Sequence, residues 1–123
     1  MKYKLAKFKV LLCLLLIIGC SSTQSSIYKP DDNSSGWKVK VIKKAAINDE
    51  FVCTINDSTV VSASFPFIGD NFEKAGMYRG KKVMMNGYRN STTSKDSNGN
   101  TQTNNSYQIR VFIDDKQVDK FDF

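Results

Sequence analysis

Residues 107–113 (YQIRVFI) carry the clearest folding signal of the chain, a strict alternation of apolar and polar side chains. A period of two is typical of a β-strand with one buried face, which here would carry Tyr107, Ile109, Val111 and Ile113. Five more runs of this kind follow one another at short spacing: residues 37–41, 50–56, 59–67, 81–89 and 117–123. Six strands without a long helical pattern predict an all-β domain, a small antiparallel barrel or sandwich.

Two features interrupt this alternation. In residues 69–80 (GDNFEKAGMYRG), Asp70 or Asn71 is placed to cap one helical turn over residues 72–75, which Gly76 would end. Within residues 81–89, Gly87 predicts a bulge or a sharp bend of the strand, because glycine weakens a strand interior.

Residues 90–106 (NSTTSKDSNGNTQTNNS) contain no large apolar side chain. Asn98-Gly99 at their centre is the strongest short hairpin signal that a sequence can offer. Two interpretations stay open: a flexible polar loop, or two polar ribbon arms that project from the sheet around an Asn-Gly turn. Loops of this length are often functional or disordered.

The N-terminus has the layout of a secretory signal peptide. Four lysines precede the apolar run of residues 10–19, and the polar residues 21–26 follow it. A transmembrane helix needs about 20 apolar residues, and this run supplies only half of that number. We therefore predict that residues 1–19 are removed.

The end of this run, Ile17-Ile18-Gly19-Cys20, resembles the lipobox of bacterial lipoproteins. The resemblance implies cleavage between Gly19 and Cys20 and acylation of the Cys20 sulfur by a diacylglycerol, usually with a further acyl chain on the new N-terminus. Two or more acyl chains make membrane attachment stable. In two-membrane bacteria an Asp after the cysteine retains such proteins at the inner membrane. Ser21 stands there in this chain, so the resemblance implies the outer membrane, with the outer face of the cytoplasmic membrane as the alternative.

Beyond Cys20 the composition divides the chain in two. Residues 20–35 are mostly Ser, Thr, Gln, Asn and Asp, which predicts a flexible tether between the lipid and the fold. Residues 36–123 then form a single β domain. Cys53 is its one cysteine, either a small buried side chain or the partner in an intermolecular disulfide.

Charge and composition exclude several functions. Four of the 18 basic residues lie in residues 1–19, which leaves 14 against 12 acidic residues, a net charge of +2 that argues against a nucleic-acid partner. The chain has no histidine, the commonest general base and metal ligand. Residues 76–81 (GMYRGK) are one residue too short for a phosphate-binding loop, and residues 96–100 (DSNGN) place glycine wrongly for a calcium loop. We predict no metal, no cofactor and no enzymatic activity.

Basic and aromatic side chains are the remaining candidates for binding. They form one surface only if the fold brings their strands together; otherwise they are the solvated side of a sheet, where lysines also discourage edge pairing. Tyr88 and Phe112 would be able to stack on bases or sugar rings. The candidate binding residues are Lys38, Lys40, Lys81, Lys82, Tyr88, Arg110 and Phe112.

A second resemblance concerns residues 78–87. Tyr78-Arg79-Gly80-Lys81-Lys82-Val83 followed by Gly87 is similar to a Tyr-x-Gly-Lys-x-Val…Gly stretch of some small OB-fold domains. This resemblance implies a five- or six-stranded barrel that binds an oligonucleotide or oligosaccharide.

Taken together, the sequence predicts a lipid-anchored, non-enzymatic interaction module of the bacterial envelope. Its expected partners are other envelope proteins or anionic envelope polymers such as lipopolysaccharide or peptidoglycan. Two alternatives stay open: an accessory lipoprotein of secretion, conjugation or exclusion encoded by a plasmid or phage, and the OB-type binder.

Overall fold

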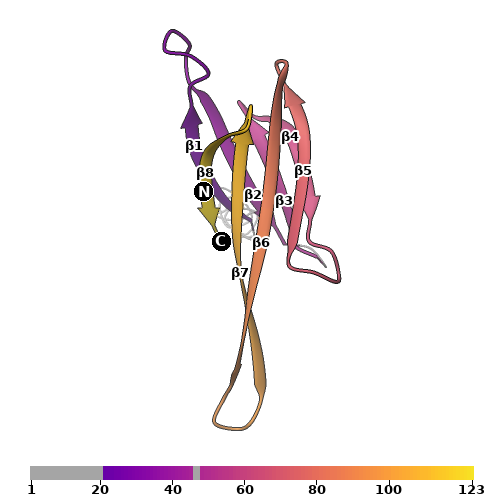
Figure 1. The fold of residues 1–123 in the computed structure, drawn as a ribbon. Coiled ribbons are helices and arrows are strands. Elements are labelled where there is room, and N and C mark those ends of the chain that lie inside the picture. The colour runs from indigo at the N-terminus through magenta and orange to yellow at the C-terminus, as the bar shows by residue number, and fades with distance from the viewer. Residues whose placement is uncertain (1–20, 46–47) are drawn as a thin grey trace, which may run out of the picture.

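A computed structural model describes residues 21–45 and 48–123 of the protein as two four-stranded antiparallel sheets that pack face to face (Figure 1). The first sheet has the order β1-β2-β3-β4 and the second the order β5-β6-β7-β8. The strands are β1 Ser22–Tyr28, β2 Trp37–Lys44, β3 Glu50–Ile55, β4 Ser58–Ser64, β5 Asn71–Tyr78, β6 Lys81–Lys95, β7 Thr101–Ile113 and β8 Lys116–Asp122. The predicted all-β class is confirmed, as a sandwich rather than a closed barrel. The described residues include no helix that is long and apolar enough to cross a membrane.

Alternate side chains of the central strands meet between the two sheets. In the first sheet the core is built around Val39 and Val41 of β2, and in the second around Val83 and Met85 of β6, all completely buried. The four apolar residues of β7 that the sequence placed on one face lie in the same core. Successive side chains of a strand point to opposite faces, so the period of two in the sequence becomes one buried and one outer face for each sheet.

Three two-residue turns lie at one end of the sandwich, the turn end. They are Asn56-Asp57, Arg79-Gly80 and Asp114-Asp115, and all six residues have positive φ, between 48° and 77°. Turns with positive φ at both central residues match the right-handed twist of antiparallel strands. Asp and Asn tolerate this conformation better than most residues. The turn chemistry of the sequence therefore fixes the register of three hairpins.

The opposite end, the arm end, is held by an aromatic cluster centred on Phe51 of β3. The Phe51 ring is fully buried and lies 5.2 Å from the ring of Tyr107, between ring centroids. It also contacts Phe65 at 5.7 Å, Phe72 at 6.3 Å and Phe123 at 5.6 Å. Because these rings come from both sheets, one side chain joins the two layers.

Residues 20–35 were expected to form a flexible tether, and the structure corrects this for Ser22–Tyr28. Residues Ser22–Tyr28 form β1, which pairs with β2 from Ser22 opposite Lys43 to Tyr28 opposite Trp37. The Tyr28 and Trp37 rings lie 5.9 Å apart, and the Gln24 side-chain amide donates a hydrogen bond to the Asp122 carbonyl of β8. The folded domain therefore includes Ser22–Tyr28 and extends well before Gly36. The polar composition of the segment did not predict this strand, because backbone pairing with β2, rather than burial of apolar side chains, stabilises it.

The structure also corrects the helical turn that was expected over residues 72–75. Residues Asn71–Tyr78 form β5, which pairs along its length with β6. Phe72 points inward, where its ring lies 4.8 Å from that of Phe65. Gly76 lets β5 approach β4, because a Cβ there would lie 2.4 Å from the Val60 carbonyl oxygen.

Gly87 marks no bulge, in contrast to the prediction. It pairs in regular register with Phe72 on one side and Ile109 on the other. A Cβ at this position would lie 2.4 Å from Cε2 of Phe72, so glycine is required for packing. The register shifts of the described sheets fall elsewhere, between Cys53 and Thr54 and between Val111 and Phe112.

Residues 90–106 form the ribbon arms that were one of the two predicted alternatives. Strands β6 and β7 stay paired as far as Lys95 opposite Thr101, well beyond the sandwich (Figure 1). We call this projecting hairpin the arm. At its tip the Asp96 carboxylate accepts hydrogen bonds from the backbone N–H groups of Asn98 and Asn100, at 2.9 and 2.8 Å. Gly99 supplies the positive φ of 82° that the turn requires.

Cys53 is fully buried, which confirms the first of its two interpretations. Burial raises the pKa of its thiol to about 12, because the thiolate would lose its hydration. At pH 8 we expect the folded protein to react very slowly with a maleimide, and the urea-unfolded protein to react rapidly. A Ser58→Cys variant, exposed at the turn end, provides the reactive control. Rapid labelling of Cys53 in the native protein would contradict the buried position.

Substitution of Phe51 tests the aromatic cluster. We expect Phe51→Ala to lower the free energy of unfolding by about 3–5 kcal/mol, because it removes a ring that contacts four others and leaves a cavity. Urea denaturation followed by Trp37 fluorescence measures this change. Phe67→Ala is the matched control: Phe67 is 86% exposed, so its loss should change stability by less than about 0.5 kcal/mol. Equal effects of the two substitutions would contradict the proposed role of Phe51.

Candidate functional site

The predicted basic residues lie on opposite sides of the sandwich. Lys38 and Lys40 alternate with buried residues of β2 and therefore point away from the core on the first sheet. Lys82 and Arg110 point outward from the second sheet. The structure therefore does not bring the candidates together in one basic surface, because a packed core separates the two outer faces.

Two of these lysines are ion-paired at the turn end. Lys40 Nζ lies 3.0 Å from Asp57 Oδ1, and Lys81 Nζ lies 2.9 Å from Asp114 Oδ2. The hydrogen bond from Lys40, and then its charge, lower the pKa of the Asp57 carboxyl. In the same way the hydrogen bond and charge of Asp114 raise the pKa of Lys81. Lys40 and Lys81 thus have partners within the fold and are less suited to hold a ligand.

Four of the predicted binding residues lie on the outer face of the second sheet. Tyr88 and Lys82 of β6 and Arg110 and Phe112 of β7 all have the outward parity of their strands. Strand pairing places Tyr88 between Asn71 of β5 and Gln108 of β7. In the next row, Asn86 lies between Glu73 and Arg110. We call the surface formed by these two rows the open face.

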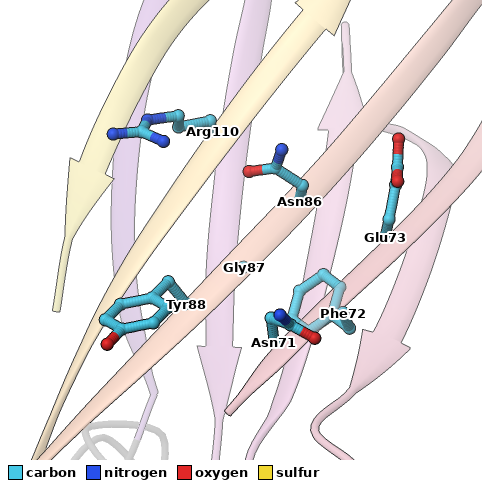
Figure 2. Close-up of a pocket in the computed structure, with 7 residues that line it drawn as sticks. All are labelled: Asn71, Phe72, Glu73, Asn86, Gly87, Tyr88 and Arg110. Atoms are coloured by element: carbon cyan, nitrogen blue, oxygen red, sulfur yellow. The ribbon is translucent and has the colours of Figure 1, made fainter.

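A shallow pocket of about 320 Å³ lies in the open face. Figure 2 shows its side chains arranged around the bare backbone of Gly87, with Arg110 and Tyr88 to one side and Glu73 to the other. The residues that line it are Asn71, Phe72, Glu73, Asn86, Gly87, Tyr88 and Arg110. The packing of Phe72 under Gly87 thus shapes the floor, and three neighbouring strands supply the walls.

The open face offers a mixed set of hydrogen-bonding groups. Arg110 only donates, the Glu73 carboxylate only accepts, and the amides of Asn71 and Asn86 do both. The Tyr88 side chain adds an aromatic surface and a hydroxyl, and the residue is 54% exposed. Arg110 is exposed and forms no ion pair with any carboxylate that the structure describes. This arrangement suits binding of a polar or anionic ligand with an apolar ring face.

Sequence reasoning found Tyr88 and Arg110 but missed three of the polar residues beside them. Asn71 and Glu73 were missed because their segment was assigned to a helical turn. Asn86 lies two residues before Tyr88, so the parity of the strand over residues 81–89 was a signal that would have placed it on the same face. Within residues 21–45 and 48–123, no group of three or more His, Cys, Asp or Glu side chains could hold a metal ion.

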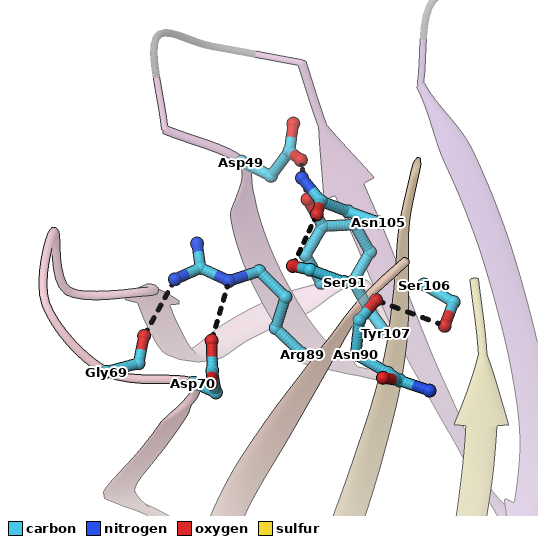
Figure 3. A network of polar contacts seen from close by, with 9 residues as sticks. All are labelled: Asp49, Gly69, Asp70, Arg89, Asn90, Ser91, Asn105, Ser106 and Tyr107. Carbon is cyan, nitrogen blue, oxygen red and sulfur yellow. Dashed lines mark hydrogen bonds and ion pairs between the residues drawn. The ribbon is translucent and has the colours of Figure 1, made fainter. Parts of the chain in front are cut away.

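A second polar cluster lies at the base of the arm (Figure 3). The Arg89 guanidinium donates to the Gly69 carbonyl at 2.7 Å and to Asp70 Oδ1 at 3.5 Å, and it lies 5.3 Å above the Phe65 ring. These contacts bind the start of the arm to residues 65–70, which we call the β4–β5 loop.

The other half of this cluster binds the arm to the β2–β3 connection. The Tyr107 hydroxyl donates a hydrogen bond to Asp49 Oδ2. Burial, then the hydrogen bond to Asp49 and its charge, raise the pKa of Tyr107. Ser91 Oγ donates to Asn105 Oδ1 at 2.7 Å across the two strands of the arm. Because the polar groups of this cluster bond to one another, we assign it to positioning the arm rather than to binding a ligand.

Comparison of the chain with family models, with curated proteins and with solved structures finds no match.

Proposed function

We propose that this protein is a bacterial envelope lipoprotein, cleaved after Gly19, acylated at Cys20 and held at the outer membrane. In this proposal the sandwich is a non-enzymatic interaction module whose open face binds an anionic glycan polymer of the envelope. The lipobox-like residues 17–20 support the anchor. The observation that carries the binding function is the pocket around Tyr88 beside Arg110, which is exposed and forms no ion pair with a carboxylate of the described residues.

The shape and chemistry of the open face favour a glycan. The pocket is shallow and open, whereas sites for small molecules enclose most of their ligand. A segment of a long polymer can lie across it. The C–H face of a sugar ring can pack on the Tyr88 ring, and Arg110 can donate two parallel hydrogen bonds to a carboxylate or phosphate. Glu73 in the same row disfavours a nucleic acid, whose dense phosphates would be repelled.

The arm favours a second candidate, an envelope protein as partner. Its two strands are exposed along their whole length, and each leaves an unpaired edge. Exposed strand edges can pair with a strand of another protein. An isolated two-stranded ribbon is only marginally stable in water, so such a partner would also stabilise it.

Substitutions on the open face test the glycan proposal. We expect Arg110→Ala and Tyr88→Ala each to weaken binding of the detergent-solubilised protein to peptidoglycan sacculi or immobilised lipopolysaccharide by about tenfold or more. A lost charge-assisted hydrogen bond of about 1.5–3 kcal/mol corresponds to at least that factor. Lys38→Ala on the opposite outer face is the control and should bind as the unmodified protein does. If the Lys38 variant loses as much affinity, or the open-face variants lose none while remaining folded, the binding site lies elsewhere.

The anchor has a separate test. We expect Cys20→Ser to block both acylation and cleavage, so that the variant keeps residues 1–19 and does not reach the outer-membrane fraction. Mass spectrometry of the unmodified protein should find acyl chains on an N-terminal Cys20, and that of the variant an unacylated protein that is longer by residues 1–19. A Cys20→Ser variant that is cleaved and found in the outer membrane, or an unacylated Cys20 in the unmodified protein, would contradict this part of the proposal.

A further inference from the structure

Two neighbouring apolar side chains in the β4–β5 loop are almost completely exposed. Phe67 is 86% and Ile68 is 94% exposed, the highest values among the exposed large apolar residues of the described chain. Burial of apolar side chains of this size is favourable, so leaving both in water costs free energy. Phe65, two residues earlier in the same loop, is buried in the aromatic cluster. Of these three apolar side chains in the loop, Phe65 is therefore packed into the core, whereas Phe67 and Ile68 point into solvent.

The loop that carries them is fixed at its C-terminal side. The Arg89 guanidinium donates to the Gly69 carbonyl at 2.7 Å, and the Arg89 backbone N–H donates to the Asp70 carbonyl at 2.7 Å (Figure 3). On its N-terminal side, Phe65 packs against the rings of Phe51 and Phe72. Phe67 and Ile68 thus project from a rigid base rather than from a flexible segment.

Strand register places this loop at the same end of the first sheet as the start of the fold. Ser22 lies opposite Lys43, Lys43 opposite Phe51, and Phe51 opposite Ala63. These four residues form one row across the sheet, about 14 Å from end to end at the usual strand spacing. The loop begins two residues after Ala63. Lys44, beside this row, is exposed and adds a positive charge that suits anionic lipid headgroups.

The chain between this row and Cys20 is very short. Two residues of fully extended chain span at most about 7 Å, so an acylated Cys20 would hold Ser22 close to the lipid surface. A long tether would have left the domain free to turn, but β1 begins at Ser22, near the start of the segment that was expected to form it.

We propose that the loop residues Phe67 and Ile68 insert into the lipid interface of the membrane that holds Cys20, as a second contact that fixes the orientation of the sandwich. This inference rests on the proposed lipid anchor. The arm leaves the same end from the second sheet, and its polar side chains cannot enter hydrocarbon without a large desolvation cost. The domain must therefore lean toward its first sheet, with the arm running along or away from the lipid surface.

An environment-sensitive fluorophore at position 68 tests this orientation. The lipidated protein carrying Ile68→Cys is labelled with a maleimide dye and reconstituted into vesicles of phosphatidylethanolamine and phosphatidylglycerol that contain lipid-attached quenchers. The buried Cys53 should not compete for the label. We expect a blue-shifted emission and several-fold stronger quenching at position 68 than at two control positions of the turn end. The controls are Met77→Cys, which replaces another exposed apolar residue, and Ser58→Cys.

The outcomes separate this inference from the proposed anchor. Protein that floats with the vesicles while the probe at position 68 remains as hydrated as the one at position 77 overturns the inference and leaves the anchor intact. Protein that is not acylated and does not float overturns both. A probe that is shielded in native envelopes but hydrated in the vesicles shows that another protein covers the loop, which also overturns the lipid contact.

Discussion

Contact between Phe51 and four other aromatic rings is the interaction on which the arrangement of both sheets depends. The Phe51 side chain comes from the first sheet, while Phe72, Tyr107 and Phe123 belong to or follow strands of the second. Interlocked rings at one end fix how the two sheets lie against each other, because each ring fills space that the others leave. The positions of β5 and of the arm follow from this cluster.

The same packing separates the two outer faces and so decides where a ligand can bind. Lys38 and Lys40 of β2 face one side of the sandwich, while Tyr88 and Arg110 face the other. Near the turn end, Lys40 and Lys81 are paired with Asp57 and Asp114. The open face therefore combines amides, a carboxylate and an aromatic ring with one positive charge, that of Arg110. A sheet face of this composition suits a ligand with hydroxyl groups and isolated charges better than a polyanion of high charge density.

The proposed binding face and the proposed membrane contact are geometrically compatible. A sandwich that leans on the lipid with its first sheet turns its second sheet, and with it the open face, away from the membrane. The short connection from Cys20 to Ser22 would keep that face within a few nanometres of the lipid surface. An anchored module of this kind would encounter polymers that run close to the membrane, and the arm would extend its contact area sideways.

Much of the fold could be predicted from the sequence, because alternation of apolar and polar residues is a local property. It was sufficient for the core strands and for the buried face of β7. It failed where a segment owes its conformation to a neighbour. β1 has few apolar side chains and is held in place by backbone pairing with the edge of β2. In the same way, β5 is a strand because it pairs with β6. Gly87 was predicted to mark a bulge or a sharp bend, although the adjacent Phe72 ring is the reason for glycine there.

The candidate site divides in the same way. By itself the sequence determined which side chains point outward on each strand, and hence that Tyr88, Arg110 and Phe112 lie on an outer face. Only the tertiary structure decided which strands are neighbours, so that Asn71 and Glu73 join this face while Lys38 and Lys40 lie on the other. The alternation of side chains along a strand is set by covalent geometry, so it can be read from the local sequence. Strand order and sheet packing are set by contacts between residues that are distant in the sequence, so they cannot be read from one strand alone.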